Sequence, residues 1–299
     1  MKKVLVIAGP TAVGKTAFSV EIAKKLNAEI ISGDSIQVYR GFDIGSGKVT
    51  EEEKQGIVHY LIDIMDPREP YSAADFQKMA RQIIDRTAGV SIICGGTGLY
   101  LKSCLYDYTF NEESGSFASD HLEKFSNEEL YAKLLETDPV QAQKIHPNNR
   151  RRILRCLTIA ERSGMKQSEI EAAQKHEMLY DAFIAGCTMD RAKLYDRINR
   201  RVEMMFEAGL ENEVRSLLDQ GVSFSDPAMK GIGYREWQGY FQGNMSAEEV
   251  KEEIQKHSRQ FAKRQYTWLN HQMPVHWFDI SEKEDTERMI NEIMAWYQR

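Results

Sequence analysis

The sequence predicts an α/β fold, in which helices flank a parallel sheet core that contains a glycine-rich loop, and an all-helical domain is inserted into that core. Two patterns predict it. Short apolar runs alternate with amphipathic stretches from the N-terminus onward, as in doubly wound parallel sheets. After about residue 112 the pattern is helical only, up to about residue 179. We therefore assign residues 1–115 and 183–299 to the core and residues 116–182 to the insert.

The strands of the core are expected where apolar runs have strand length. These runs are residues 3–8, 28–32, 58–64, 90–94 and 183–188. Between them, residues 15–26 and 72–86 have the apolar spacing of helices, and the second of these opens with the capping box Ser72-x-x-Asp75. Strands that alternate with helices favour a parallel arrangement of the sheet.

The remaining helices lie in the insert and in the last third of the chain. In the insert they are expected at residues 127–135, 139–145 and 150–162, after the polar, turn-prone segment 112–116. The C-terminal part has strong helix patterns at residues 191–208, 211–219 and 246–269. The last of these opens with the capping box Ser246-x-x-Glu249.

Composition excludes several classes of protein. Of the 299 residues, 42% are hydrophobic and 28% charged, which is typical of a folded chain. The net charge of -6 argues against a protein that coats nucleic acid without specificity, because such binding rests on neutralising phosphates. No apolar stretch is long enough to cross a bilayer, and the four cysteines have no spacing suited to zinc. We therefore expect a cytoplasmic protein with reduced, mostly buried thiols and no membrane partner.

The clearest motif is the glycine-rich loop between the first expected strand and the first expected helix. It reads Gly9-Pro10-Thr11-Ala12-Val13-Gly14-Lys15-Thr16 and matches the pattern G-x-x-x-x-G-K-[ST]. In such loops, which bind ATP in kinases, backbone amides surround phosphate oxygens, Lys15 would bridge those oxygens, and Thr16 can bind Mg²⁺. The motif predicts a diphosphate or triphosphate ligand but does not say which bond breaks.

An ordinary NTPase is disfavoured by the strand at residues 90–94. NTPases with this loop usually hold Mg²⁺ with an acidic residue that ends a core strand. Here the strand is followed by Gly95-Gly96-Thr97, which offers no carboxylate.

Asp34 is the candidate for acid–base chemistry. It follows the second expected strand, so it lies at the carboxyl edge of the sheet beside the loop, where open α/β sheets bind ligands. A carboxylate there can accept a proton from the group that attacks a phosphate-bearing substrate. The same residue could instead cap a turn, since Gly-Asp-Ser is common turn chemistry, and the local sequence leaves both roles open.

A series of sequence blocks resembles the bacterial tRNA dimethylallyltransferases. Besides the loop, they include Ser32-Gly33-Asp34-Ser35-Ile36-Gln37-Val38-Tyr39, residues 59–64, 71–76, 95–100, 145–149 and 190–202, Gly231-Ile232-Gly233-Tyr234-Arg235-Glu236, and Ala262-Lys263-Arg264-Gln265-Tyr266-Thr267-Trp268, in the family's order. The resemblance spans nearly the whole chain. Asp43-Ile44-Gly45 and Lys48 also match, within a stretch that in the family usually reads Asp-Ile-Gly-Thr-Ala-Lys-Pro and that here reads Asp43-Ile44-Gly45-Ser46-Gly47-Lys48-Val49. The chain departs from the family at Ser46, Gly47 and Val49 of this stretch and at residues 110–125.

The resemblance implies a reaction and its catalytic residues. In that family, N6 of the adenosine next to the 3′ end of the anticodon attacks the allylic carbon of dimethylallyl diphosphate, and diphosphate leaves. Asp34 matches the catalytic aspartate that takes the N6 proton. Lys15, Thr16 with Mg²⁺, and Arg201 would stabilise the leaving diphosphate together with the loop, Gly9 to Thr16. Arg197 shares a helical face with Arg201, and without the resemblance both could be surface charges.

The resemblance also implies the residues that contact tRNA at its anticodon stem-loop. On the acceptor side these are Asp34, Ser35, Ile36, Gln37 and Thr97, and in the insert they are Arg151, Arg152, Ile153, Leu154 and Arg155. Reading a single adenine requires flipping it out of the anticodon stack. A second basic cluster, formed by Lys256, Arg259, Lys263 and Arg264, could equally be a solvated helix face. We expect a monomer.

Two other readings of the sequence compete with prenyl transfer. A small-molecule kinase would use the same loop and would place an acceptor hydroxyl beside Asp34. It explains the core but not a helical insert with an arginine run. A non-catalytic nucleotide-binding switch or RNA-binding module would leave the placement of Asp34 unused.

Overall fold

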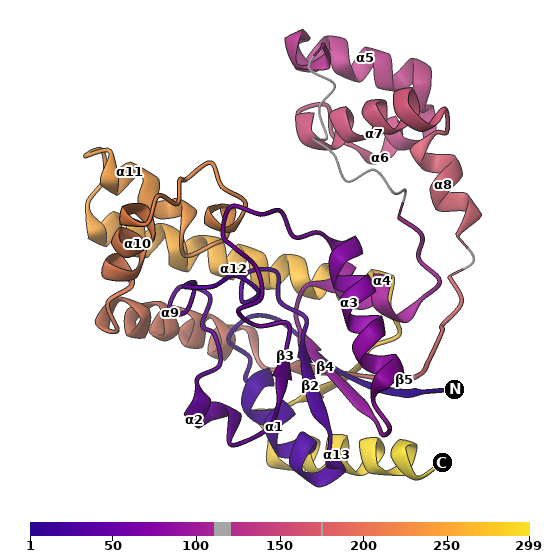
Figure 1. Ribbon diagram of the computed structural model, residues 1–299, viewed down its shortest axis with the longest axis vertical. Coiled ribbons are helices and arrows are strands. Elements are labelled where there is room, and N and C mark those ends of the chain that lie inside the picture. The colour runs from indigo at the N-terminus through magenta and orange to yellow at the C-terminus, as the bar shows by residue number, and fades with distance from the viewer. Residues whose placement is uncertain (111–120, 175) are drawn as a thin grey trace. The chain divides into compact units, whose positions relative to one another are not determined.

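The computed structural model describes residues 1–110, 121–174 and 176–299, and these form two compact units (Figure 1). One unit joins Met1–Tyr106 to Met178–Arg299, and the other is Asp107–Glu177. The insert was expected at residues 116–182, so its observed limits lie earlier in the chain. Backbone pairing of Leu179 N with Leu105 O at 2.8 Å and a bridge between Tyr106 and Met178 assign these residues to the core. The turn-prone segment 112–116 lies outside the described residues.

The core contains a six-stranded parallel sheet of order β3-β2-β4-β1-β5-β6. Its strands are β1 (Lys3–Ala8), β2 (Glu29–Ser32), β3 (His59–Tyr60), β4 (Ser91–Gly95), β5 (Asp181–Thr188) and β6 (His276–Asp279). The predicted parallel α/β core is thereby confirmed, and β6 is an addition to it. Strand β3 is shorter than the expected 58–64, because Leu61 and Asp63 adopt φ angles of 62° and 56° that turn the chain away.

Helices cover both faces of this sheet, with α1 and α13 on one side and α3 and α4 on the other (Figure 1). The helices of this unit are α1 (Lys15–Leu26), α2 (Glu51–Lys54), α3 (Ala73–Arg86), α4 (Gly98–Leu105), α9 (Arg191–Glu207), α10 (Leu210–Asp219), α11 (Gln238–Phe241), α12 (Ala247–Gln272) and α13 (Lys283–Gln298), with the 3₁₀ turns η2 (Ala228–Lys230) and η3 (Arg235–Trp237). Both predicted capping boxes, at Ser72 and Ser246, are formed.

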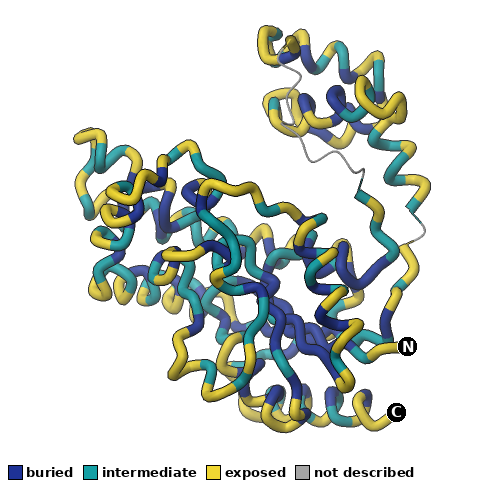
Figure 2. The backbone as a smooth tube through the Cα atoms, in the orientation of Figure 1, coloured by how far each residue is buried: buried dark blue, intermediate teal, exposed yellow. Residues whose placement is uncertain are grey.

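The core of this unit is centred on the middle strands, which are buried along most of their length (Figure 2). In β1, Val4 to Ala8 are fully buried, because the strand lies between β4 and β5 and is covered on both faces. A second cluster of buried side chains, including Phe42, Tyr234 and Trp237, packs around α9, α10 and α12. Since β1, β2 and β4 run in parallel, their carboxyl ends meet at one edge.

The second unit has a hydrophobic core of its own. Its elements are η1 (Leu122–Lys124), α5 (Asn127–Thr137), α6 (Pro139–Lys144), α7 (Arg150–Ser163) and α8 (Gln167–Ala173). Leu130 and Leu134 of α5 pack with Ile153 and Leu157 of α7, and all four side chains are buried. The predicted all-helical character of the insert holds for its described residues.

The four cysteines, Cys94, Cys104, Cys156 and Cys187, are free thiols, and all but Cys94 are buried. This confirms the expected state of the cysteines. Among the described residues, no helix combines the length and apolar character needed to cross a bilayer.

Candidate active site

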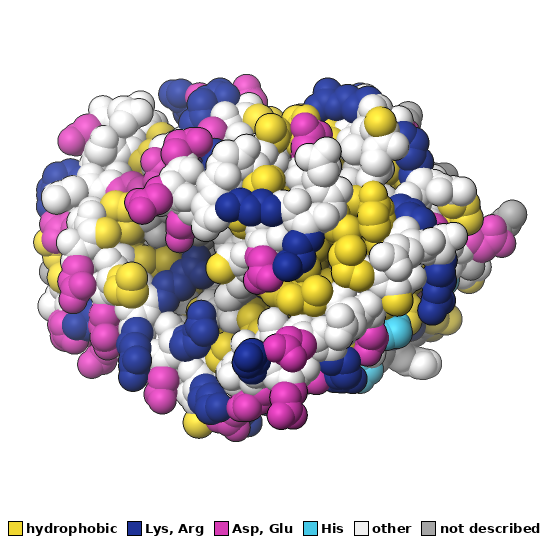
Figure 3. Space-filling view, turned by 90° about the horizontal axis from the view of Figure 1, so that it is seen from below, with side chains coloured by type: hydrophobic (Ala, Val, Ile, Leu, Met, Phe, Trp, Pro, Cys, Tyr) yellow, Lys and Arg dark blue, Asp and Glu magenta, His cyan; other side chains and the backbone are white. Residues whose placement is uncertain are grey.

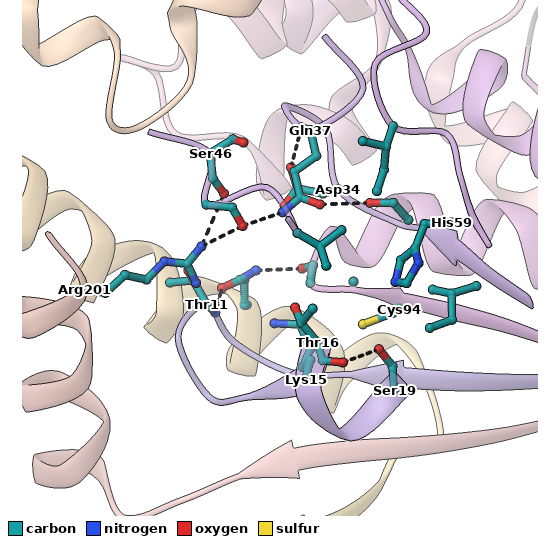
Figure 4. A pocket seen from close by; sticks show the side chains of 18 of the residues that line it. Thr11, Lys15, Thr16, Ser19, Asp34, Gln37, Ser46, His59, Cys94 and Arg201 are labelled. Carbon is teal, nitrogen blue, oxygen red and sulfur yellow. Dashed lines mark hydrogen bonds between the residues drawn. The ribbon is translucent and has the colours of Figure 1, made fainter. Parts of the chain in front are cut away.

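A pocket of about 670 Å³, counting its open mouth, lies where β1, β2 and β4 end. It brings the loop and Asp34 together with residues from α9 and α12. Its lining is Thr11, Lys15, Thr16, Ser19, Ile30, Ser32, Asp34, Gln37, Ser46, Gly47, Val49, His59, Ile62, Cys94, Gly95, Gly96, Arg201, Phe261 and Gln265. In Figure 4, Arg201 and Thr11 lie on one side of the pocket, His59 and Cys94 on the other, and Thr16 lies between them.

The loop turns tightly between β1 and α1 because its glycines adopt conformations that other residues avoid. Gly9 and Gly14 have φ angles of 145° and 111°. A Cβ at Gly9 would lie 2.5 Å from Cys187 O on the neighbouring strand, so only glycine fits there. Gly14 caps α1 without a side-chain hydrogen bond, which leaves the first amides of that helix for a ligand. A helix N-terminus in this state favours an anion.

Lys15 extends its amine within the loop, where Nζ donates a hydrogen bond to Pro10 O at 2.6 Å. Burial lowers the pKa of Lys15, and the nearby Arg201 lowers it further. The nearby carboxylate of Asp34 acts in the opposite direction. An anion bound here would stabilise the charged amine, because opposite charges at close range favour the ionised form.

Arg201 reaches the pocket from α9. Its Nη2 donates hydrogen bonds to Ser46 O at 3.3 Å and Gly47 O at 3.4 Å. Burial lowers the pKa of Arg201, while Asp34 and then Glu53 raise it. Within residues 1–110, 121–174 and 176–299, Arg201 forms no ion pair. The loop and Arg201 therefore present positive charge to the same space. Arg197, four residues earlier, approaches the loop as well, since a Cβ at Gly14 would lie 3.5 Å from its Nη2.

Asp34 caps a turn, and its position is also compatible with the acid–base role that its sequence left open. Its Oδ1 accepts hydrogen bonds from Ile36 N at 2.8 Å and Gln37 N at 3.2 Å, which is the turn-capping role. No hydrogen bond in the described part of the chain involves Oδ2. Asp34 is the only acidic side chain among the described pocket-lining residues. One oxygen thus fixes the carboxylate, and the other can accept a proton.

Of the other residues expected on the acceptor side, one lines the pocket and three lie outside its lining. Gln37 lines the pocket, where its Nε2 donates to Gly47 O at 3.2 Å and its Oε1 accepts from Ser32 Oγ at 3.3 Å. Ser35 and Ile36 are half-buried outside the pocket lining, and Ile36 packs against the cluster around Trp237. Thr97 is half-buried at the N-terminus of α4 and also lies outside the lining.

Gln265 is a pocket residue to which the sequence assigned no role. It is 7% exposed on α12, and its carboxamide joins two strand ends. Oε1 accepts a hydrogen bond from Thr11 N at 2.9 Å, and Nε2 donates one to Gly96 O at 3.0 Å. Gln265 entered the sequence analysis only as part of the block 262–268 that resembles the family. A helical pattern does not show which loop a side chain contacts.

His59 also lines the pocket without having been singled out. Its Nδ1 lies 2.9 Å from Ile57 O, which makes Nδ1 the protonated nitrogen, and its buried Nε2 has no hydrogen-bond partner. Burial lowers the pKa of His59, which favours the neutral ring. A neutral imidazole beside Ile30 and Ile62 adds an aromatic surface to this side of the pocket.

In the insert, the expected tRNA-contacting residues fall on different faces of α7. Arg151, Arg152 and Arg155 are exposed. Ile153 and Leu154 are 0% and 8% exposed and pack in the core of this unit, so their side chains do not reach a partner, contrary to the expectation. The neighbouring Arg150 is structural, since its guanidinium donates to Phe125 O at 2.7 Å and Glu123 O at 2.8 Å.

The second basic cluster, on α12, is partly engaged in local contacts. Lys256 Nζ pairs with Glu253 at 2.7 Å, and Arg259 donates to Asn199 Oδ1. Lys263 and Arg264 are exposed. Lys and Arg side chains are interspersed with Asp and Glu on the face drawn in Figure 3. The chain has 39 Lys and Arg and 45 Asp and Glu residues, so acidic side chains are at least as common as basic ones. Recognition of an anionic polymer would therefore depend on local groups of cations.

Comparison with known proteins identifies the family. The family model described as IPP transferase matches residues 37–272. The tRNA dimethylallyltransferases of Anoxybacillus flavithermus and Bacillus cytotoxicus are 45% and 48% identical over 301 and 300 residues, covering 99% and 98% of this chain and 96% and 95% of theirs.

Solved structures agree. The tRNA isopentenylpyrophosphate transferase of Bacillus halodurans is 39% identical with a TM-score of 0.75, covering 100% of this chain and 97% of its own. A eukaryotic dimethylallyltransferase acting on tRNA is 28% identical with a TM-score of 0.84, covering 99% of this chain and 80% of its own. The chain therefore belongs to the tRNA dimethylallyltransferase family.

Proposed function

We propose that this enzyme transfers a dimethylallyl group from dimethylallyl diphosphate to N6 of the adenosine on the 3′ side of the anticodon in tRNA, and releases diphosphate. Prenyl transfer to tRNA is the activity for which its relatives are named. The observation that supports this donor, acceptor and leaving group is the presence of opposite charges in one pocket. A single carboxylate, Asp34, lines the same cavity as the cations Lys15 and Arg201.

The proposed step forms one bond and breaks another at the same carbon. The N6 lone pair attacks the allylic carbon, and the electron pair of the C–O bond leaves with diphosphate. Asp34 Oδ2 then accepts the N6 proton, since Oδ1 is held by the turn. Lys15, Arg201 and the free amides of α1 stabilise the charge that grows on the departing diphosphate.

The apolar side of the pocket supports a short prenyl donor. Ile30, Val49 and Ile62 line the cavity together with the neutral ring of His59. Ile30 and His59 are opposite each other across β2 and β3, so their side chains belong to one surface. An allylic tail placed there would have its diphosphate toward the loop.

Magnesium is proposed as the cofactor, with Thr16 as its protein ligand. The fit rests on the donor set, because the Thr16 hydroxyl lines the pocket next to Lys15 and magnesium binds hard oxygens, usually few from protein and the rest from phosphate and water. When bound, the ion would neutralise charge on the diphosphate. The loop and Arg201 would keep the diphosphate in place.

The tRNA is proposed to contact the exposed arginines of α7, namely Arg151, Arg152 and Arg155, and to place the flipped adenine beside Asp34, Gln37 and Thr97. Ser35 and Ile36, which lie outside the pocket lining, would support the backbone on the acceptor side of the pocket. The enzyme is proposed to act as a monomer, because the donor and acceptor groups of the pocket come from one chain.

One assay separates this function from a small-molecule kinase. Purified protein with Mg²⁺, labelled dimethylallyl diphosphate and unmodified tRNA should yield labelled tRNA. Consumption of ATP with a metabolite, without label in tRNA, would instead support the kinase. The described pocket disfavours that outcome, because β4 ends in Cys94-Gly95 and offers no carboxylate for a nucleotide-bound metal.

A further inference from the structure

Glu213 of α10 binds a row of backbone amides from the segment between β2 and β3. Its Oε2 accepts hydrogen bonds from Asp43 N at 3.1 Å and Ile44 N at 2.7 Å. Its Oε1 accepts one from Gly45 N at 3.1 Å. Three consecutive amides thus converge on one carboxylate, the arrangement in which a backbone turn binds an anion. Here the anion is a side chain of the protein itself.

Tyr234 extends this arrangement by one residue. Its hydroxyl donates to Glu213 Oε1 at 2.7 Å and accepts from Ser46 N at 3.1 Å. Tyr234 is fully buried, and its ring lies against Gly45, where a Cβ would approach Cζ to 2.6 Å. Burial, followed by the Glu213 carboxylate, raises the pKa of Tyr234 well above its usual value, so the hydroxyl remains a donor.

The carbonyls at the end of this segment bind Arg201. Ser46 O and Gly47 O are the two acceptors of its Nη2, and the guanidinium lies on the Cα of Gly47, where a Cβ would come within 1.7 Å of Nη2. Arg201 has no carboxylate partner in the described part of the chain. Its position therefore depends on two carbonyls whose own amide segment is held by Glu213.

We propose that Glu213 is a positioning residue for the donor site: by binding the amides of residues 43–45, it fixes the carbonyls that orient Arg201 toward the diphosphate. The proposal rests on the proposed function, since it takes the ligand of Arg201 to be the diphosphate. Glu213 touches neither substrate. Because Gly47 O also accepts from Gln37 Nε2, the test must isolate the part of the effect that passes through Arg201. Removing the charge of Glu213 should weaken binding of diphosphate more than binding of tRNA.

The test is a double-mutant cycle on the affinity for inorganic pyrophosphate, measured by titration calorimetry with Mg²⁺. Glu213→Gln keeps the shape but replaces one acceptor oxygen with an NH₂ group, which can only donate. The bonds that this oxygen accepted from backbone amides are lost, and we expect the Kd for pyrophosphate to rise about tenfold. Arg201→Ala should raise Kd by at least as much. The double variant should bind no more weakly than Arg201→Ala, because Glu213 has nothing left to position.

Glu211→Gln is the matched control. Glu211 lies on the same helix and also accepts a tyrosine hydroxyl, that of Tyr240 at 2.9 Å, but its other partner is Arg215 rather than the 43–46 segment. Its Kd for pyrophosphate should match that of the wild type. Equal effects of Glu211→Gln and Glu213→Gln, or additive effects of Glu213→Gln and Arg201→Ala, would overturn the proposal.

Two further measurements keep the test decisive. If Glu213→Gln unfolds, Tyr234→Phe removes one bond to Glu213 and one to Ser46 and should show the same dependence on Arg201 with a smaller effect. An Arg201→Ala protein that binds pyrophosphate normally would end the proposal. Whether the proposed function falls with it is decided separately, by assaying prenyl transfer to tRNA with the same variant.

Discussion

Gln265 and Thr11 are 254 residues apart in sequence and are joined by a hydrogen bond of 2.9 Å from the Thr11 amide to the Gln265 carboxamide. The same carboxamide donates to Gly96 O at 3.0 Å. Gly96 must be glycine, because a Cβ there would lie 2.7 Å from the backbone oxygen of Gly9 as well as 2.1 Å from Nε2 of this glutamine. One side chain of α12 thus connects the loop that follows β1 to the turn that precedes Thr97.

Replacing Gln265 with methionine should therefore reduce both stability and turnover. The methionine keeps the volume but leaves the Thr11 amide and the Gly96 carbonyl without partners, which costs about 2 kcal/mol of unfolding free energy. Urea unfolding and steady-state prenyl transfer would measure the two effects. Gln77→Met is the control, since Gln77 also donates to a backbone carbonyl, Ser103 O at 2.8 Å, but lies outside the pocket. Its turnover should match the wild type, and a comparable loss there would contradict the role given to Gln265.

Asp34→Asn should lower the rate of prenyl transfer by about 10²- to 10⁴-fold, the range that loss of general-base catalysis produces. The amide oxygen can still accept from Ile36 N and Gln37 N, so the turn should persist. Single-turnover transfer of labelled donor would give the rate. Filter binding would give the affinity for tRNA, which should change less than threefold, or by less than about 0.7 kcal/mol. Loss of tRNA binding in parallel with activity would instead indicate that Asp34 only shapes the acceptor side.

The stability of the fold should decrease as the pH falls below about 6.5, and His59 should be one cause. Burial lowers the pKa of His59 in the folded protein below its usual 6.5, so the neutral ring is favoured on folding. This contribution is fully present above pH 6.5 and is lost as the pH falls through the lower folded-state pKa. His59→Asn should therefore lose less unfolding free energy than the wild type between pH 7.5 and 5.5. An identical pH dependence of the two proteins would rule out this contribution.

Arg151 and Arg150 should respond differently to alanine. Arg151→Ala, alone or with Arg152→Ala, should weaken tRNA binding and reduce the slope of log Kd against log salt by about 1 for each phosphate that the variant no longer neutralises. It should leave thermal stability unchanged, since both side chains are exposed. Arg150→Ala should lower stability instead, because Arg150 bonds the carbonyls of Phe125 and Glu123. Thermal unfolding and binding at several salt concentrations would show whether the two effects separate in this way.

The sequence predicted those parts of the fold and site that depend on local patterns. The loop at residues 9–16 and Asp34 each follow a short buried strand, so their meeting at one sheet edge could be inferred. Strand β6 could not, because it has four residues of which only Phe278 is buried. Likewise α4 has only eight residues and begins at a glycine, so its apolar pattern spans little more than two turns.

Residues whose contacts are distant in sequence could not be predicted from local patterns. Gln265 contacts a loop 254 positions away, and Glu213 contacts amides 168 to 170 positions away. Helical periodicity shows that such residues are near a buried face but not which backbone groups they meet. For Ile153 and Leu154 the same periodicity was available and would have placed them inward, between the exposed arginines of α7. The resemblance, which assigned the whole segment to tRNA contact, concealed that distinction.

The chain leaves the core at Asp107 and returns to it at Glu177, and these two residues are joined by a hydrogen bond from Asp107 N to Glu177 O of 2.9 Å. Because the two ends of the inserted unit lie side by side, the unit closes on the core as a loop does. The entropic cost of bringing such ends together rises only slowly with the length between them. Changing the length of the helical unit between these two positions should therefore cost little closure entropy and leave the strand order of the core as it is.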